Sequence, residues 1–364
     1  MPRKRNPENA GLPARWRRTR NAYYYQVPPG LEHLWDGKQT FKLGNSLPEA
    51  YKTWAERINR PDNTKTIAQL LDRYALEVVP TKAASSRGSN VIWVAQLRKV
   101  FGEMPLSGLK PQHIYRYVDM RSMKKTGTDG RVTGGRTVAH REVEILSHAF
   151  TKAVEWGYLD RHPFKGEVRL AGEPPRDRYV EDWEVLECLA LAPRRSSGSV
   201  LAIQAYIRIK LMTGMARSDL LRLTTENLRD DGIHIQRHKT AGRTGKRTIY
   251  VWTQELRDAV AMAEAARPCK SLFLFCNRRG EGYINEAAGT SHGWDSMWQR
   301  FMDRVLTDTK IEHRFTEHDL RAKCASDATS LEHARALLSH ADSRTTDRIY
   351  RRKAEVVKPL GGVR

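Results

Sequence analysis

Apolar and aromatic residues near the N-terminus follow a strand pattern and then change to a helical one. Strand-forming aromatics fill residues 22–27, and a second short strand is predicted at 40–43. The sequence Ser46-Leu47-Pro48-Glu49 has the pattern of a capping box and opens the next helix. Residues 1–62 are therefore expected to form a small sheet with one helix. A basic arm at 2–20 precedes it.

The pattern from Thr66 to about Val168 is helical, because apolar residues recur every three or four positions. Helices are expected to start near Ile67 and Lys110, to include Trp93, Leu97 and Val100, and to cover 138–156. The glycine-rich stretch 124–136 is predicted to be a flexible turn. Residues 63–170 are expected to form an all-α domain. Its outer Lys and Arg residues fit either a DNA-binding face or an ordinary solvated bundle.

The C-terminal half mixes helices with one hairpin. A Pro-containing stretch near 171–178 is typical of an interdomain linker. Helices are predicted at 182–191 and 199–212, and hairpin strands at 232–238 and 247–252. The predicted fold class is multidomain α+β, with this mixed α/β domain spanning 171–364.

Charge narrows the choice of partners. The 364 residues hold 63 Lys+Arg against 42 Asp+Glu, a net charge of +21. Such a field attracts a polyanion, and double-stranded DNA is the densest common one. A generally basic protein, such as a ribosomal one, would have a similar composition.

Other compositional features point to no membrane, metal or cofactor. No apolar run has the length of a membrane span, and no apolar signal segment follows the basic N-terminus. The four cysteines lack zinc-site spacing, which favours free thiols in a reducing compartment. No Walker-type phosphate loop or carboxylate cluster suited to a metal is present. We expect a soluble, intracellular protein.

The segment Thr316-Glu317-His318-Asp319-Leu320-Arg321 could carry chemistry. Thr316 can cap a helix, and a spacing of three places His318 and Arg321 on one helix face. A histidine beside a guanidinium can hydrogen-bond a phosphate diester and exchange protons with it. An ordinary surface helix could have the same pattern.

Two further segments contain candidate groups. His340 ends the stretch Leu337-Leu338-Ser339-His340, and Tyr350 follows among arginines. Nearby positive charge favours the phenolate that a phosphate-attacking tyrosine needs, although such a tyrosine is also typical of a half-exposed anchor. Lys239, at the start of the hairpin loop, could donate a proton to a leaving oxygen or simply be solvated.

Together these residues resemble the tyrosine recombinase (phage integrase) family. The tail from Leu337 to Tyr350 is similar to the family's Leu-Gly-His…Thr-Thr…Tyr signature, with Ser339 in place of the usual glycine and one extra residue before the tyrosine. The resemblance covers the whole chain and implies an arm-binding, a core-binding and a catalytic domain. The matching residues, in family order, are Lys239, His318, Arg321, His340 and Tyr350.

One motif departs from the family pattern. The first family arginine belongs to Thr-Gly-x-Arg, whereas this chain has Thr213-Gly214-Met215-Ala216-Arg217. Neighbouring helical residues point about 100° apart, so Arg217 can replace the missing arginine only through an adjusted turn. Otherwise Ala216 marks an inactivated or engineered form.

The resemblance implies a reaction without metal or nucleotide. Tyr350 would attack the scissile phosphate and form a 3′-phosphotyrosyl bond. Arg321 and His340 would bind the phosphate, Lys239 would protonate the leaving 5′ oxygen, and His318 would assist proton transfer with Tyr350. The bond would conserve the energy needed for rejoining.

The resemblance also implies partners. These are core and arm sites on double-stranded DNA, a homotetramer on DNA in which the tail 354–364 packs against a neighbour, and accessory DNA-bending proteins. Two alternatives remain: a non-enzymatic sequence-specific DNA-binding protein, and a monomeric type IB topoisomerase.

Overall fold

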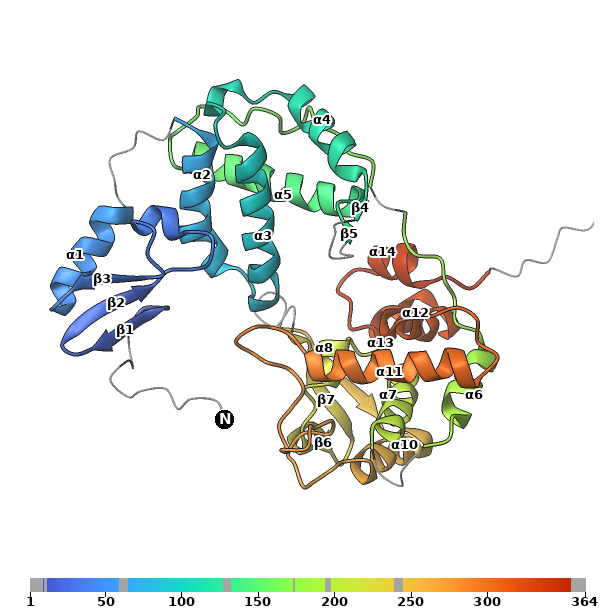
Figure 1. Cartoon of the computed structure of the whole chain (residues 1–364). Helices are drawn as coiled ribbons and strands as arrows, with labels where there is room; N and C mark the ends of the chain where they lie inside the picture. The colour runs from blue at the N-terminus through green and yellow to red at the C-terminus, as the bar shows by residue number, and fades with distance from the viewer. Residues whose placement is uncertain are drawn as a thin grey trace, which may run out of the picture. The chain divides into compact units, whose positions relative to one another are not determined.

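The chain forms two compact units, Met1–Glu173 and Pro174–Arg364, shown as a ribbon in Figure 1. The computed structural model describes residues 9, 12–58, 65–126, 132–172, 174–193, 198–238 and 245–354. The division into three domains at 62/63 and 170/171 stays a prediction.

The first part of unit 1 is a three-stranded antiparallel sheet with one helix. Strands β1 (Trp16–Thr19), β2 (Ala22–Gln26) and β3 (Thr40–Gly44) lie in that order, and α1 (Leu47–Ile58) follows after the short η2 (Glu32–Trp35). Aromatic rings fill its core, with Trp35 stacked on Trp54 at 5.2 Å between centroids. The expected sheet and helix are confirmed. The predicted basic arm at 2–20 contains strand β1, in which Trp16 is buried while Arg17, Arg18 and Thr19 are exposed.

The rest of unit 1 is a helical bundle. It contains α2 (Ile67–Arg73), the helical turns η3 (Tyr74–Val78), η4 (Val79–Thr81) and η5 (Leu106–Gly108), and α3 (Ala84–Phe101), α4 (Pro111–Ser122) and α5 (Arg136–Glu155). A buried ion pair joins α4 to α5: Glu142, with no exposed surface, accepts hydrogen bonds from Arg121 at 2.8 Å and from the Tyr117 hydroxyl at 2.6 Å.

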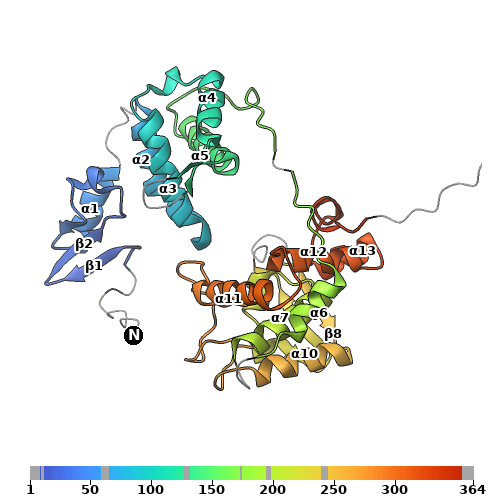
Figure 2. The same cartoon turned by 45° about the vertical axis from the view of Figure 1, so that its right-hand side comes forward.

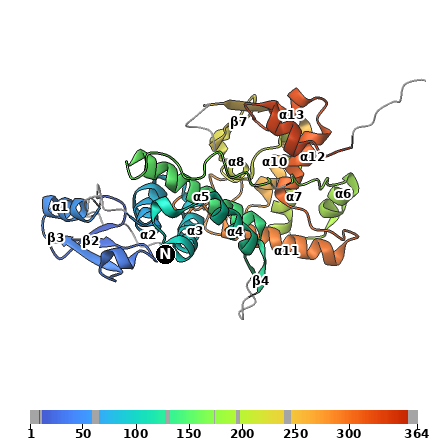
Figure 3. The ribbon, with the colours of Figure 1, turned by 90° about the horizontal axis from the view of Figure 1, so that it is seen from above.

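Two details of this bundle differ from the predictions. The expected turn at 124–136 contains a two-stranded ribbon, β4 (Lys125–Thr126) and β5 (Val132–Thr133). Figure 3 shows β4 beyond the end of α4. The predicted face of α3 was also wrong at Val100, which is 45% exposed, while Leu97 and Phe101 are buried.

Unit 2 is built around a central helix, α7 (Ser199–Thr213). Helix α7 packs against α10 (Gln254–Ala265), α11 (His292–Asp308) and α12 (Glu317–Asp327). The remaining helices are α6 (Asp182–Ala190), α8 (Arg217–Leu220), α13 (Leu331–Leu337) and α14 (Ser343–Thr345), with the turns η6 (Thr225–Asn227) and η8 (Thr346–Tyr350). Figures 1 and 2 both show α13 beside α12.

The predicted hairpin forms the sheet of unit 2. Strands β6 (Leu228–Arg229), β7 (Gly232–Gln236) and β8 (Arg247–Val251) are antiparallel and lie in that order. The multidomain α+β fold class is therefore confirmed. In the described part of the chain, no helix combines the length and apolar character needed to cross a bilayer.

Candidate active site

Three C-terminal segments bring four of the predicted residues together. Helix α12 carries His318 and Arg321, the turn after α13 carries His340, and η8 ends at Tyr350. The Tyr350 hydroxyl is 3.0 Å from His318 Nε2. The Arg321 guanidinium lies 5.4 Å from the centroid of the Tyr350 ring, and the His340 ring lies 5.2 Å from it. A phenol thus has two imidazoles and one guanidinium around it.

The start of α12 is stabilised by Asp319, which has no exposed surface. Its carboxylate accepts from the backbone N–H of Thr316 at 2.8 Å and pairs with Arg352 at 2.7 Å and Arg176 at 3.1 Å. Burial raises the pKa of Asp319, but these hydrogen bonds and charges outweigh it and lower the pKa below its ordinary value. Asp319 therefore links the helix to the chain just after Tyr350.

The backbone of Tyr350 has a second attachment to α12. Ser326 donates to the Tyr350 carbonyl at 2.9 Å and accepts from the Arg352 N–H at 2.8 Å. Both contacts restrain the end of η8 and hence the position of the phenol.

Arg321 has the surroundings of an anion-binding group. It is 3% exposed, and its hydrogen-bond partners among the described residues are all neutral: the Gly214 and Leu338 carbonyls, the latter at 2.8 Å, and His340 Nε2 at 3.1 Å. A buried guanidinium without a carboxylate is costly, whereas a phosphate can accept two hydrogen bonds from it. The arrangement therefore suits a phosphate diester.

The contacts of His340 define its tautomer. A guanidinium can only donate, so His340 Nε2 accepts from Arg321 and the ring proton lies on Nδ1. Nδ1 then donates to the Thr346 hydroxyl at 2.8 Å, and both residues are buried. Burial, followed by the positive charges of Arg321, Arg237 and Lys246, lowers the pKa of His340 to about 3. The imidazole is neutral at pH 7.

Ser339 explains the family preference for glycine at its position. The N–H groups of Ser339 and His340 bond the carbonyls of Ala336 and Arg335 at 2.9 and 3.0 Å, which is a Schellman ending of α13. This ending needs a left-handed residue, and Ser339 has a φ of 52°. Its hydroxyl lies 2.5 Å from the Thr248 hydroxyl, a contact that a glycine would lack.

His318 is exposed on its solvent side but loses water on the side of Tyr350 and Arg352. This desolvation, and then the positive charge of Arg352, lowers the pKa of His318 to about 4. The ring is therefore neutral at pH 7 and can exchange a proton with Tyr350.

The hairpin packs against the site. Lys246 donates to the His340 carbonyl at 2.8 Å, and the Tyr250 hydroxyl donates to the Leu337 carbonyl at 2.8 Å. At the other end of the loop, the His238 N–H donates to Asp219 at 3.0 Å. Lys239 itself lies outside the described residues, as does the tail after Ala354.

The structure does not bring Arg217 to the Tyr350 cluster. Arg217 begins α8, where it pairs with Asp295 at 2.5 Å and Glu317 at 3.3 Å and donates to Ser291. Ala216 precedes it as the N-cap residue, with only a methyl side chain. The adjusted turn that would let Arg217 replace the family arginine is not found.

Sequence reasoning missed several groups around the site. No contact with the site was predicted for Thr346, and Arg237 had no assigned role. The fully buried Lys210 donates to the Met215 carbonyl at 3.0 Å, and desolvation lowers its pKa to about 7. Helix α7 is mostly apolar but also contains Gln204 and Arg208, so the sequence pattern did not single out Lys210.

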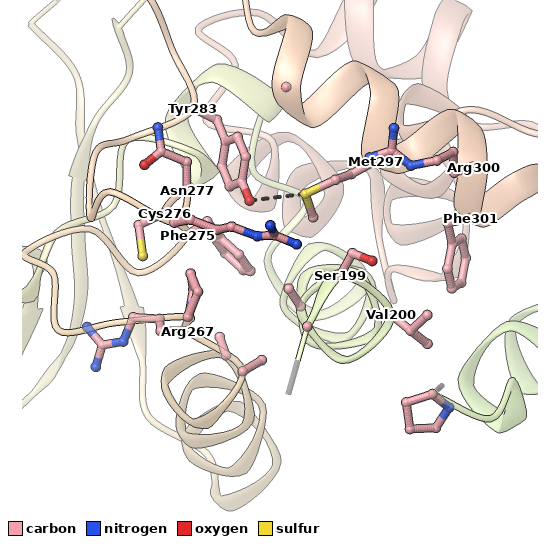
Figure 4. Close-up of a pocket in the computed structure, with 18 of the residues that line it drawn as sticks. Ser199, Val200, Arg267, Phe275, Cys276, Asn277, Tyr283, Met297, Arg300 and Phe301 are labelled. Carbon is pink, nitrogen blue, oxygen red and sulfur yellow. Dashed lines mark hydrogen bonds between the residues drawn. The ribbon is translucent and has the colours of Figure 1, made fainter. Parts of the chain in front are cut away.

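A cavity of about 880 Å³ lies elsewhere in unit 2, between the starts of α7 and α11 and the segment after α10. Figure 4 shows aromatic and arginine side chains around it, including Phe275, Tyr283, Arg267 and Arg300. Its described lining includes none of the predicted site residues.

Comparison with family models gives one match. Residues 184–356 match the model of the phage integrase family. No curated protein sequence matches the chain.

Solved structures share the fold. A lambda integrase dimer bound to a COC' core site has a TM-score of 0.59 at 16% identity, covering 96% of this chain and 98% of that one. A lambda integrase tetramer bound to a Holliday junction also gives 0.59, at 17% identity, with 96% and 99% covered. The Tn1549 transposon integrase with a circular intermediate DNA gives 0.61 at 14% identity, with 78% and 94% covered.

The segment 184–356 therefore matches the phage integrase family, and nearly the whole chain has the fold of the lambda integrase structures.

Proposed function

We propose that the chain is a site-specific DNA recombinase, a phage or prophage integrase that cleaves and rejoins strands for integration and excision. The observation that carries the proposal is the Tyr350 hydroxyl, 3.0 Å from the neutral His318 and beside the buried Arg321. A non-enzymatic DNA-binding protein would have no need for this grouping.

The cleavage step begins at Tyr350. Its oxygen attacks the scissile phosphorus while its proton passes towards His318, and the bond between phosphorus and the 5′ oxygen breaks. Lys239 gives the leaving oxygen a proton, which yields a free 5′ hydroxyl and a 3′-phosphotyrosyl bond. Attack by a 5′ hydroxyl of the partner strand reverses these changes and restores the diester.

Arg321 and His340 bind the phosphate during this step. The phosphate oxygens would replace the Arg321–His340 contact, so that the guanidinium donates to an oxygen as negative charge develops. His340 can donate from Nε2 only if it gains a proton or changes its tautomer. Bound phosphate favours the gain of a proton, because an anion raises the pKa of a neighbouring imidazole.

The partners of this reaction would be double-stranded DNA and other copies of the chain. The helical domain and the catalytic domain would bind the core site, and the N-terminal sheet would bind arm sites. Recombination between two duplexes needs four protomers, and one similar structure is a lambda integrase tetramer on a Holliday junction. Accessory DNA-bending proteins would assist assembly in the bacterial cytoplasm.

A second candidate is a form that binds DNA but cleaves it poorly. The observation that favours it is the methyl group of Ala216 in the position of a phosphate-binding arginine. Loss of one such donor costs about 3–4 kcal/mol of transition-state stabilisation in other enzymes.

A trapping experiment tests the proposal. Duplexes that the protein itself selects from a random pool would be nicked near the bound centre, so that the cleaved fragment diffuses away and religation stops. We expect the wild-type chain to form a covalent complex, and Tyr350→Phe to bind the same duplex without forming one. Binding without any covalent complex from the wild type would favour the non-enzymatic alternative.

A further inference from the structure

Arg237 lies just after the end of β7 in the hairpin, near residues that contact α8 and the turn carrying His340. It follows Gln236, the last residue of β7. Gln236 pairs with Arg247 on β8. The next residue, His238, is hydrogen-bonded to Asp219 of α8 at 3.0 Å, and α8 starts directly after Ala216. Across the hairpin, Lys246 donates to the His340 carbonyl. His238, next to Arg237, and Lys246, across the hairpin, thus contact α8 and the turn that carries His340.

The Nε–H group of half-buried Arg237 lacks a hydrogen-bond acceptor in the described part of the chain. Its Nε is buried and has no hydrogen-bond partner among the described residues. Arg217, by contrast, has Asp295, Glu317 and Ser291 around it. A buried donor without an acceptor is costly, so an unpaired arginine at this place points to an acceptor that arrives with a ligand.

The charge of Arg237 interacts with Arg321 and His340, which lie beside Tyr350. Burial, and then the positive charge of Arg321, lowers the pKa of Arg237. The charge of Arg237 in turn contributes to the low pKa of His340. Asp219 partly offsets the charge of Arg237. Two guanidiniums whose charges act on each other form a site for an anion with two free oxygens.

We propose that Arg237 supplies the second guanidinium for the scissile phosphate, in place of the arginine missing at position 216. Arg321 would donate to one non-bridging oxygen and Arg237 to the other. The proposal rests on the function proposed above, and it explains how a chain with Ala216 can remain an active recombinase.

The test compares Arg237→Ala with Arg247→Ala, a matched change of an exposed arginine on the neighbouring strand. The rate of covalent complex formation on the selected duplex would be measured under single-turnover conditions. We expect Arg237→Ala to slow it by about 100-fold or more, the usual effect of removing one such donor. Arg247→Ala should stay within a few-fold of the wild type.

A second substrate distinguishes phosphate binding from a purely structural role. A methylphosphonate at the scissile position replaces one charged non-bridging oxygen with a neutral methyl group. If Arg237 acts on that charge, the difference between the wild type and Arg237→Ala should shrink at least tenfold on this substrate. A misfolded variant would lose activity equally on both substrates.

The outcomes separate the two proposals. The wild type could form the covalent complex while Arg237→Ala forms it at the same rate, or is slowed equally on both substrates. Either result would overturn the role of Arg237 and leave the proposed function standing. No covalent complex from the wild type would overturn the proposed function and this inference with it.

Discussion

Replacing Thr346 with valine removes one hydrogen bond and keeps the shape of the side chain. Thr346 has no exposed surface, and its hydroxyl accepts from His340 Nδ1 at 2.8 Å. Water therefore cannot replace the lost acceptor. The imidazole cannot escape by moving its proton to Nε2, because that atom faces the donor Arg321 at 3.1 Å.

The magnitude follows from the buried donor left behind. An unsatisfied buried group costs about 1–3 kcal/mol, so Thr346→Val should lower the free energy of unfolding by about that amount. Loss of this hydrogen bond also leaves the His340 imidazole less well oriented. Covalent complex formation should slow by about 5- to 150-fold, because about 1.4 kcal/mol corresponds to a factor of ten.

The assays are urea denaturation and the trapping reaction, with Thr345→Val as the matched control. Thr345 is exposed, and its substitution should change stability by no more than about 0.5 kcal/mol. The reasoning would be refuted if both variants were equally stable and cleaved DNA at the wild-type rate.

Three other predictions follow from the same structure. The pKa values of His318 and His340, about 4 and about 3, lie below the ordinary 6.5, so the unfolded chain binds protons that the native one does not. The free energy of unfolding should therefore fall as pH drops from about 6.5 towards 4. A variant with both His318→Gln and His340→Gln should reduce this pH dependence, measured by urea denaturation at each pH. Ala216→Arg should restore cleavage to Arg237→Ala in the trapping reaction; no recovery would mean that the two positions do not serve the same phosphate. Deleting residues 1–62 should weaken binding to arm-site duplexes in gel-shift titrations and leave core-site cleavage intact, whereas unchanged arm binding would contradict the domain assignment.

Periodicity predicted the elements whose two faces differ in polarity. The hairpin strands at 232–236 and 247–251 and helix α12 were found close to their predicted positions. Strand β1 was missed because the arginines around Trp16 have the composition of a disordered basic arm, although one buried aromatic is enough to place a short edge strand on the sheet.

The candidate site was predictable only where side chains share an element or a motif. His318 and Arg321 share one helix face, and their spacing showed this. The contacts of Arg217 depend on Asp295 and Glu317, which are far away in sequence, so no local pattern could show that this guanidinium is already engaged. The unpaired state of Arg237 likewise appears only when the partners of every neighbouring residue are known.

The most direct test of the account is to identify the residue that becomes joined to DNA. The trapped complex would be digested with protease and nuclease, and the peptide carrying the nucleotide would be sequenced by mass spectrometry. The account predicts a 3′-phosphoryl group on the hydroxyl of Tyr350. A nucleotide on any other side chain would contradict it.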